Sequence, residues 1–215
     1  MTNHFHVAET FVSIQGESTW AGCPCFFIRL AGCNLRCVYC DTAYALEGGE
    51  LRTLEDLVRE AVGSGLPVLE VTGGEPLLQQ GTPALLRALL PLGTVLLETN
   101  GSLDIACVPE GVRIILDIKT PASGQGETMR WENLAGLRPG DEIKFVLCSR
   151  SDYEWARTLL RERNLAGGGR TVLFGAAWGR LPHADLAAWI LEDRLPVRLN
   201  PVLHRWIWPD SCRGR

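Results

Sequence analysis

The chain alternates short, continuously apolar runs with stretches in which apolar residues recur at helical spacing. Runs rich in Val, Ile and Leu, without polar alternation, are typical of strands that are buried on both faces of a parallel sheet. We expect such strands at residues 26–31, 67–71, 94–97, 112–118, 142–147 and 171–174. The alternation of strand and helix predicts βα units around a parallel sheet.

The segments between these strands carry start and stop signals for helices. The first expected helix begins at a capping box of Thr53 and Asp56 and ends at the glycine-rich residues 63–65. The second begins at Thr82 and Pro83, and the third at a cap formed by Ser151 and Glu154. The pattern of residues 185–192 predicts a fourth. The segment between the third and fourth expected strands is barely long enough for a helix.

A closed eight-fold barrel takes about 250 residues, and only about six βα units fit into these 215 residues. We therefore expect one domain, residues 1–215, folded as a partial, open parallel βα barrel; an ordinary open doubly wound sheet is the alternative. The informative residues lie at the C-terminal ends of the strands, where parallel βα folds have their active sites. They are a cysteine-rich loop and residues 72–76, 98–101, 117–119, Lys144 and 175–178.

Composition excludes several classes of function. Apolar residues make up 46% and charged residues 21% of the chain, and the formal net charge is −4, which argues against a broad nucleic-acid-binding face. No apolar run approaches the roughly 20 residues of a membrane span, and the N-terminus lacks the basic-then-apolar layout of a secretory signal. We expect a cytoplasmic protein without a membrane or nucleic-acid partner.

The loop after the first strand has the spacing C-x3-C-x2-C at Cys33, Cys37 and Cys40. Three thiolates on one loop can hold a [4Fe–4S] cluster and leave one iron open to an amino-carboxylate ligand. Zinc held by these cysteines with a His or Asp is an alternative, although structural zinc sites usually show two separated ligand pairs. Three buried structural thiols are a further alternative, and Cys23 and Cys25 are interpreted as incidental thiols.

The cysteine motif after an apolar strand resembles the signature of the radical S-adenosylmethionine (SAM) superfamily, and residues 71–76, VTGGEP, are similar to its glycine-rich motif. Residues 9–17 (ETFVSIQGE), 26–42, 98–101 and 198–209 resemble the 7-carboxy-7-deazaguanine synthase family. That resemblance implies a modified partial βα barrel, a homodimer, and SAM, a [4Fe–4S] cluster and Mg²⁺ as cofactors. The implied reaction is the ring contraction of 6-carboxy-5,6,7,8-tetrahydropterin to 7-carboxy-7-deazaguanine with loss of ammonia, in queuosine biosynthesis.

The resemblance also implies the site residues. The implied cluster ligands are Cys33, Cys37 and Cys40, and the implied Mg²⁺ ligand is Thr42. The implied substrate contacts are Ile14, Gln15, Gly16, Arg29, Thr72, Glu98, His204 and Pro209, with Glu17 as a weaker candidate. The implied SAM contacts are Tyr39, Gly74, Asp117, Ile118, Lys119, Gly175, Ala176, Ala177 and Trp178. Two of these segments depart from the family pattern. Residues 117–119 stand where the family has a Ser-Pro-Lys contact, and residues 175–178 stand where it has a Gln-Pro-type contact.

By the same resemblance, flavodoxin or ferredoxin reduces the cluster, SAM yields a radical that takes a hydrogen atom from carbon 6 of the pterin, and no side chain acts as acid or base. Two other functions stay open on the sequence. Another radical SAM enzyme, such as an activating enzyme for a glycyl-radical partner, has a similar cysteine loop and glycine-rich motif. An iron–sulfur electron carrier or a zinc-binding module is the alternative outside the superfamily.

Overall fold

The computed structural model describes residues 4–209 and 213–214. Its centre is a nine-stranded sheet with the order β3-β1-β2-β4-β5-β6-β7-β8-β9. The strands are β1 His4–Ile14, β2 Pro24–Leu30, β3 Glu50–Thr53, β4 Val68–Gly73, β5 Thr94–Thr99, β6 Arg113–Ile118, β7 Glu142–Leu147, β8 Thr171–Ala176 and β9 Arg198–Leu199. Neighbours from β2 to β9 pair in parallel, whereas β1 is antiparallel to both β2 and β3.

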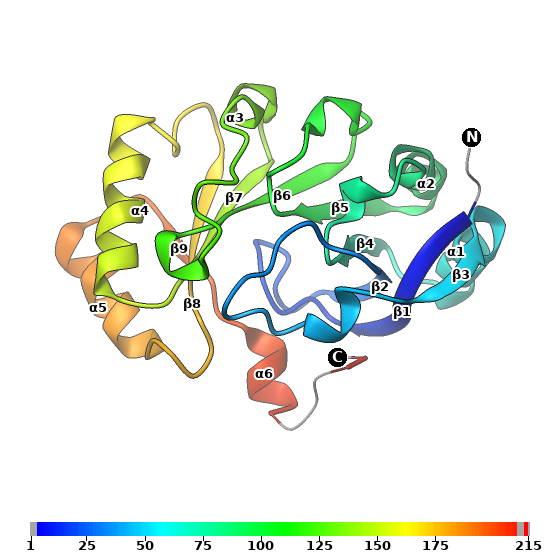
Figure 1. Cartoon of the computed structure of the whole chain (residues 1–215), viewed down its shortest axis with the longest axis horizontal. Helices are drawn as coiled ribbons and strands as arrows, with labels where there is room; N and C mark the ends of the chain where they lie inside the picture. Colours follow the sequence, from blue (N-terminus) through cyan, green and yellow to red (C-terminus); the bar gives the residue numbers. More distant parts are fainter. Residues whose placement is uncertain (1–3, 210–212, 215) are drawn as a thin grey trace.

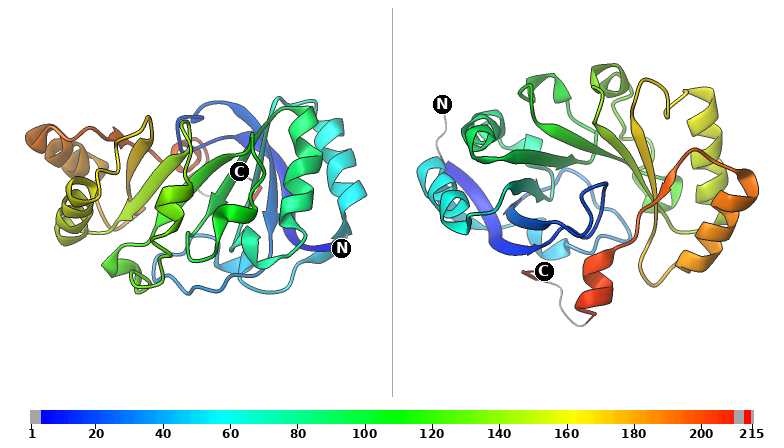
Figure 2. Two further views of the ribbon diagram at one scale, coloured as in Figure 1. Left: turned by 90° about the horizontal axis from the view of Figure 1, so that it is seen from above. Right: turned by 180° about the vertical axis from the view of Figure 1, so that it is seen from behind.

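The sheet curves strongly but does not close, with β3 and β9 as its edges (Figure 1). The helices are α1 Leu54–Ser64, α2 Thr82–Leu89, α3 Asn133–Gly136, α4 Arg150–Glu162, α5 His183–Asp193 and α6 Leu203–Ile207. Helices α1 to α5 lie outside the curve, while α6 and the loop after β2 lie across its open inner side (Figures 1 and 2). This is the expected partial βα barrel, since a doubly wound sheet would carry helices on both faces.

Two apolar clusters fill the two sides of the sheet. The larger one packs the outer helices against the strands and includes Leu57 of α1, Leu86 of α2 and Tyr153 of α4, all fully buried. A smaller cluster inside the curve joins Cys25, Phe27, Val68, Leu96 and Ile115. Side chains alternate between the two faces of a strand, so the residue two positions after each member of this cluster on its strand also points to the inner side.

Most of the expected elements are present. The six expected strands correspond to β2 and β4 to β8, and a 3₁₀ turn, Ile105–Cys107, is the regular element between β5 and β6. Thr53 caps α1 by accepting a hydrogen bond from the Asp56 amide, and Gly65 ends the helix in the left-handed conformation with a φ of 65°. Among the described residues, no helix is long and apolar enough to cross a membrane.

Two expectations need correction. The cap of α4 is Ser149, whose hydroxyl accepts from the Asp152 amide, and not Ser151. Strands β1, β3 and β9 were not expected, because they lie at the margins of the sheet and lack the continuous apolar run of a strand buried on both faces.

Candidate active site

A cavity of about 320 Å³ opens at the C-terminal ends of the parallel strands. The ends of β2, β4, β5, β6, β7 and β8 all contribute to its wall, together with the cysteine loop, the loop after β1 and helix α6. The expectation that six strand ends meet at one rim is therefore confirmed.

Most residues singled out in the sequence line this cavity. They are Ile14, Gln15, Gly16, Glu17, Arg29, Cys33, Cys37, Tyr39, Cys40, Thr42, Thr72, Gly74, Glu98, Asp117, Lys119, Gly175, Ala176, Ala177, Trp178 and His204. Two do not line it. The side chain of Ile118 is fully buried in the outer core, and Pro209 is exposed beyond α6.

The cysteine loop is fixed by its contacts with the next two strands. The amide of Glu75 donates to the Gly32 carbonyl at 2.8 Å, and that of Gly74 donates to the Leu30 carbonyl at 3.1 Å. The Asn100 side-chain amide donates to Asn34 Oδ1 at 3.1 Å and lies 3.9 Å from the Cys33 sulfur. An amide donor beside a thiolate sulfur is the kind of contact that adjusts an iron–sulfur cluster.

The three cysteines supply the free thiols that a [4Fe–4S] cluster needs as ligands. All three line the cavity and are partly buried, and none is in a disulfide. In the described part of the chain, no three His, Cys, Asp or Glu side chains converge closely enough to hold one metal ion. A cubane binds each thiolate to a different iron, so its ligands need not converge on one point. Burial raises the pKa of Cys33 and of Cys37, so iron binding must displace their protons.

The glycine-rich motif packs directly on the cysteine loop. A Cβ on Gly74 would collide with the Gly32 carbonyl oxygen and with Cys33, so a glycine is required for this approach. The next residue, Glu75, is fully buried and accepts hydrogen bonds from the Asn100 amide at 2.7 Å and from the Thr99 hydroxyl at 2.8 Å. Glu75 thereby ties the ends of β4 and β5 together beneath the cysteines.

Arg29 lies on β2 at one side of the cavity. Its Nε donates to Glu9 Oε1 at 2.9 Å, and Tyr44 donates to the same oxygen at 2.7 Å. Burial opposes the charge of Arg29, but the nearby Tyr44 and Glu9 hold its pKa above the usual value. The terminal Nη groups make no hydrogen bond to a residue that the structure describes. They remain available for a carboxylate, to which a guanidinium can donate two parallel hydrogen bonds.

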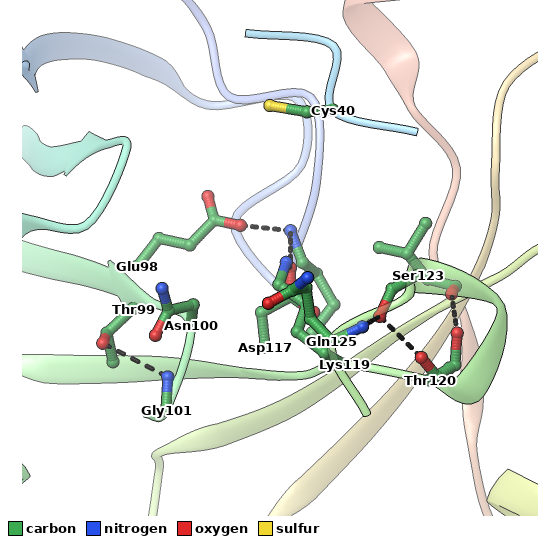
Figure 3. A network of polar contacts seen from close by, with 12 residues as sticks. Cys40, Glu98, Thr99, Asn100, Gly101, Asp117, Lys119, Thr120, Ser123 and Gln125 are labelled. Carbon is green, nitrogen blue, oxygen red and sulfur yellow. Dashed lines mark hydrogen bonds and ion pairs between the residues drawn. The ribbon is translucent and has the colours of Figure 1, made fainter. Parts of the chain in front are cut away.

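A buried lysine forms the floor of the cavity. The ammonium group of Lys144 on β7 pairs with Glu98 of β5, lies 3.0 Å from Glu17 Oε2, and is 3.8 Å from Asp117 Oδ2. Asp117 in turn pairs with Lys119 at 2.7 Å. Figure 3 shows Glu98, Asp117 and Lys119 close together, across the cavity from Cys40. The neighbouring Glu17, Glu98 and Asp117 raise the pKa of Lys144 well above its usual value, although burial opposes this.

Helix α6 closes the remaining side. The Leu203 amide donates to the Gly16 carbonyl at 2.8 Å, and the His204 ring packs so closely on Gly16 that a Cβ there would collide with it. Arg205 lies 3.6 Å from Asp41 of the cysteine loop. Burial lowers the pKa of His204. The helix thus joins the loop after β1 to the cysteine loop, and its residues His204 and Arg205 line the cavity.

Thr42 and the end of β8 complete the wall. Thr42 precedes a 3₁₀ turn, Ala43–Ala45, but its hydroxyl makes no capping hydrogen bond there and lies 3.8 Å from the Cys40 sulfur. At β8, the Ala177 amide donates to the Leu147 carbonyl at 2.9 Å. Trp178 is 45% exposed and contacts the Trp206 ring edge-on with a centroid distance of 5.8 Å.

Two polar groups in this site were not expected from the sequence, and two others were given too little weight. Glu70 is a charged residue within an apolar run, and Asn200 had no signal. Lys144 was expected at the rim only as a strand-end residue. The Asn200 side chain donates to Glu17 Oε2 at 2.9 Å, so Glu17 belongs to the network more firmly than expected. Cys23 and Cys25 lie with the inner apolar cluster, and burial raises the pKa of Cys25.

Known proteins are similar to this chain in sequence and in fold. The sequence profile of the Radical SAM superfamily matches residues 27–161. The chain is 45% identical to the 7-carboxy-7-deazaguanine synthase of Chlorobaculum tepidum, over 97% of this chain and 96% of the relative. It is 40% identical to the protein of that name from Koribacter versatilis, over 97% and 99% of the two chains. The crystal structure of QueE from Escherichia coli has a TM-score of 0.75 at 21% identity, covering 92% of this chain and 93% of that one, and supports the fold.

Proposed function

Because this chain belongs to the radical SAM superfamily and, within it, to the 7-carboxy-7-deazaguanine synthases, we propose that its cavity binds a carboxylated tetrahydropterin beside SAM and a [4Fe–4S] cluster. The enzyme is a radical SAM lyase of queuosine-precursor biosynthesis. The observation that carries the proposed site is the meeting of the three cysteines, the glycine-rich motif and the Arg29–Glu98–Lys144 groups in one cavity.

The cofactor side of the cavity is the part nearest the cysteine loop. Cys33, Cys37 and Cys40 would hold the cluster, and the close approach at Gly74 leaves backbone groups there free of side-chain cover. When bound, the cluster and SAM supply the one-electron cleavage that generates a radical able to take a hydrogen atom from the substrate. The buried Asp117 carboxylate, held by Lys119, is suited to accept hydrogen bonds from ribose hydroxyls.

The substrate side is formed by residues that suit a carboxypterin. We propose that the free Nη groups of Arg29 bind the substrate carboxylate and that Glu98 accepts hydrogen bonds from the amino and ring N–H groups. Lys144 holds Glu98 in place by an ion pair. His204 and its helix α6 cover the substrate and exclude water, as radical chemistry requires.

Three further features belong to the proposal. Thr42, whose hydroxyl makes no capping bond, would be a ligand of Mg²⁺, which prefers oxygen ligands and retains waters. Flavodoxin or ferredoxin would supply the electron. The family resemblance also implies a homodimer and the cytosol as the place of action.

Product analysis tests the proposed reaction. Protein reconstituted anaerobically with iron and sulfide is incubated with SAM, a reductant, Mg²⁺ and 6-carboxy-5,6,7,8-tetrahydropterin. The proposal predicts 7-carboxy-7-deazaguanine and ammonia in equal amounts, and less product when Mg²⁺ is removed by chelation. SAM cleavage that is unaffected by the pterin and yields no deazaguanine would contradict it.

A further inference from the structure

Glu70 is a carboxyl group on the inner face of β4, and the substrate contacts proposed above leave it without a role. It is only 2% exposed, lines the cavity, and lies two residues before Thr72 on the same face of the strand. Its Oε2 accepts a hydrogen bond from the Gln15 side-chain amide, whose oxygen accepts from the Glu17 backbone amide at 2.9 Å. Among the described residues, the Glu70 carboxyl has no other hydrogen-bond partner. Its second oxygen is therefore left to the cavity.

The surroundings of Glu70 disfavour a charge. The groups that face it are Glu17 of the loop after β1, Cys25 and Arg29 of β2, Glu98 of β5 and Lys144 of β7. Burial above all, and then the like charge of Glu98, raise the pKa of Glu70 well above its usual value. Lys144 and Arg29 act against this by lowering the pKa of Glu70, but the Lys144 ammonium forms its ion pairs with Glu98 and Glu17. A neutral carboxyl both accepts and donates a hydrogen bond, whereas a carboxylate only accepts.

We propose that Glu70 is a substrate-binding residue that works as a neutral acid, with its carbonyl oxygen bonded to Gln15 and its O–H donated to an acceptor atom of the substrate ring. This inference rests on the proposed function and extends it. The pyrimidine edge of a pterin alternates N–H donors with acceptors, namely an oxo oxygen and a ring nitrogen. Glu98 meets the donors, and Glu70, beside it in the cavity, meets an acceptor. A cavity wall made of carboxylates alone would repel the acceptors.

Two substitutions at Glu70 test the hydrogen bond. Glu70→Gln keeps an oxygen for Gln15 and an N–H donor for the substrate, whereas Glu70→Val keeps neither and suits a buried strand. In the cluster-loaded enzyme we expect the KM for the carboxypterin to stay within about threefold for Glu70→Gln and to rise about tenfold for Glu70→Val. Equal losses in the two variants, or no loss in Glu70→Val, would overturn the proposal. Equilibrium dialysis with SAM, on wild type and on both variants, separates damage to the cofactor site from loss of the substrate contact.

Infrared spectroscopy tests the protonation state independently of turnover. The cluster-loaded wild-type protein at neutral pH should show the C=O stretch of a buried protonated carboxyl, and this band should disappear in Glu70→Gln but persist in Glu98→Gln. Absence of the band from the wild-type-minus-Glu70→Gln difference spectrum would overturn the neutral acid. If wild-type enzyme makes no deazaguanine from the pterin, the proposed function fails and the substrate contact fails with it. The infrared band then still decides whether Glu70 is neutral.

Discussion

Replacing Lys144 with methionine removes the ammonium group from the centre of the cavity floor and keeps an unbranched side chain in its place. The Lys144 side chain is 5% exposed, and its Nζ lies 3.0 Å from Glu17 and 3.8 Å from Asp117, besides pairing with Glu98. At an effective dielectric constant of about 20, these two distances correspond to attractions of about 5.5 and about 4.4 kcal/mol. The cost of taking the lysine out of water offsets most of that attraction.

Loss of one partner from a buried pair leaves the other charges uncompensated, which costs about 3–5 kcal/mol. In a protein of this size, each kcal/mol of lost stability lowers the melting temperature by about 2–4 °C. The melting temperature of Lys144→Met should therefore fall by roughly 6–20 °C. Affinity for the substrate and for SAM should fall together, because Lys144 touches both Glu98 and Asp117.

Thermal unfolding of the anaerobically purified proteins measures this loss, with Arg59→Met as the matched control. Arg59 pairs with Asp56 at 2.8 Å, but its side chain is 74% exposed, and such surface pairs contribute at most about 1 kcal/mol. The folded-state pKa of Lys144 is raised, so its contribution is complete below the unfolded value of about 10.4 and is lost only at higher pH. The difference from wild type should therefore be constant across the neutral pH range. A melting temperature within about 2 °C of wild type, or a difference that varies with pH in that range, would contradict this expectation.

Three more substitutions test other parts of the account. Cys37→Ala should abolish SAM cleavage under reducing conditions while circular dichroism stays unchanged, and full cleavage would exclude the cluster assignment. Gly74→Ala should weaken SAM binding and cost about 1–3 kcal/mol of stability, because its Cβ would collide with the Gly32 carbonyl; equilibrium dialysis with SAM and denaturant unfolding measure the two effects. Burial lowers the pKa of His204, so its neutral form is favoured in the folded state, and stability is lost as the pH falls from about 6.5 through the lowered value. In His204→Gln this loss between pH 7.5 and 5.5 should be smaller, and an unchanged loss would assign it to another group.

The sequence predicted the outer half of the barrel well because that half follows simple rules. The strands are apolar, and Thr53 and Pro83 mark the starts of two helices. The C-terminal ends of parallel strands lie at the same edge of the sheet. The shift in the α4 cap has a local cause. Ser149 and Ser151 are both acceptable caps, and the extended backbone of Ser149 lets its hydroxyl reach the Asp152 amide.

The inner face of the sheet was harder to predict. Its strands change from apolar to polar halfway along, as in Val68 followed by Glu70 and Leu96 followed by Glu98. A pattern based on continuous apolar runs treats Glu70 as an exception and does not assign it to the cavity. Asn200 lies just after the short strand β9, so no local signal linked it to Glu17, 183 positions away in the sequence. Such pairings depend on how the whole sheet curves, which brings the loop after β1 next to the residues after β9.

The cluster motif and the glycine-rich motif were predictable because their chemistry requires particular residues at fixed spacing. Cys33, Cys37 and Cys40 had to share one loop, and Gly74 had to let the backbone approach that loop. The contacts of Arg29 with Glu9 and Tyr44 were not predictable, since they depend on the antiparallel pairing of β1 with β2.

In the proposed complex, one cavity brings the pterin close enough to SAM for direct hydrogen transfer. Carboxypterin carrying deuterium at carbon 6 tests this transfer, with the reconstituted enzyme, SAM and a reductant under anaerobic conditions. Mass spectrometry should find deuterium in 5′-deoxyadenosine in step with the formation of 7-carboxy-7-deazaguanine. Deoxyadenosine without deuterium, in a reaction that leaves the pterin intact, would contradict direct transfer.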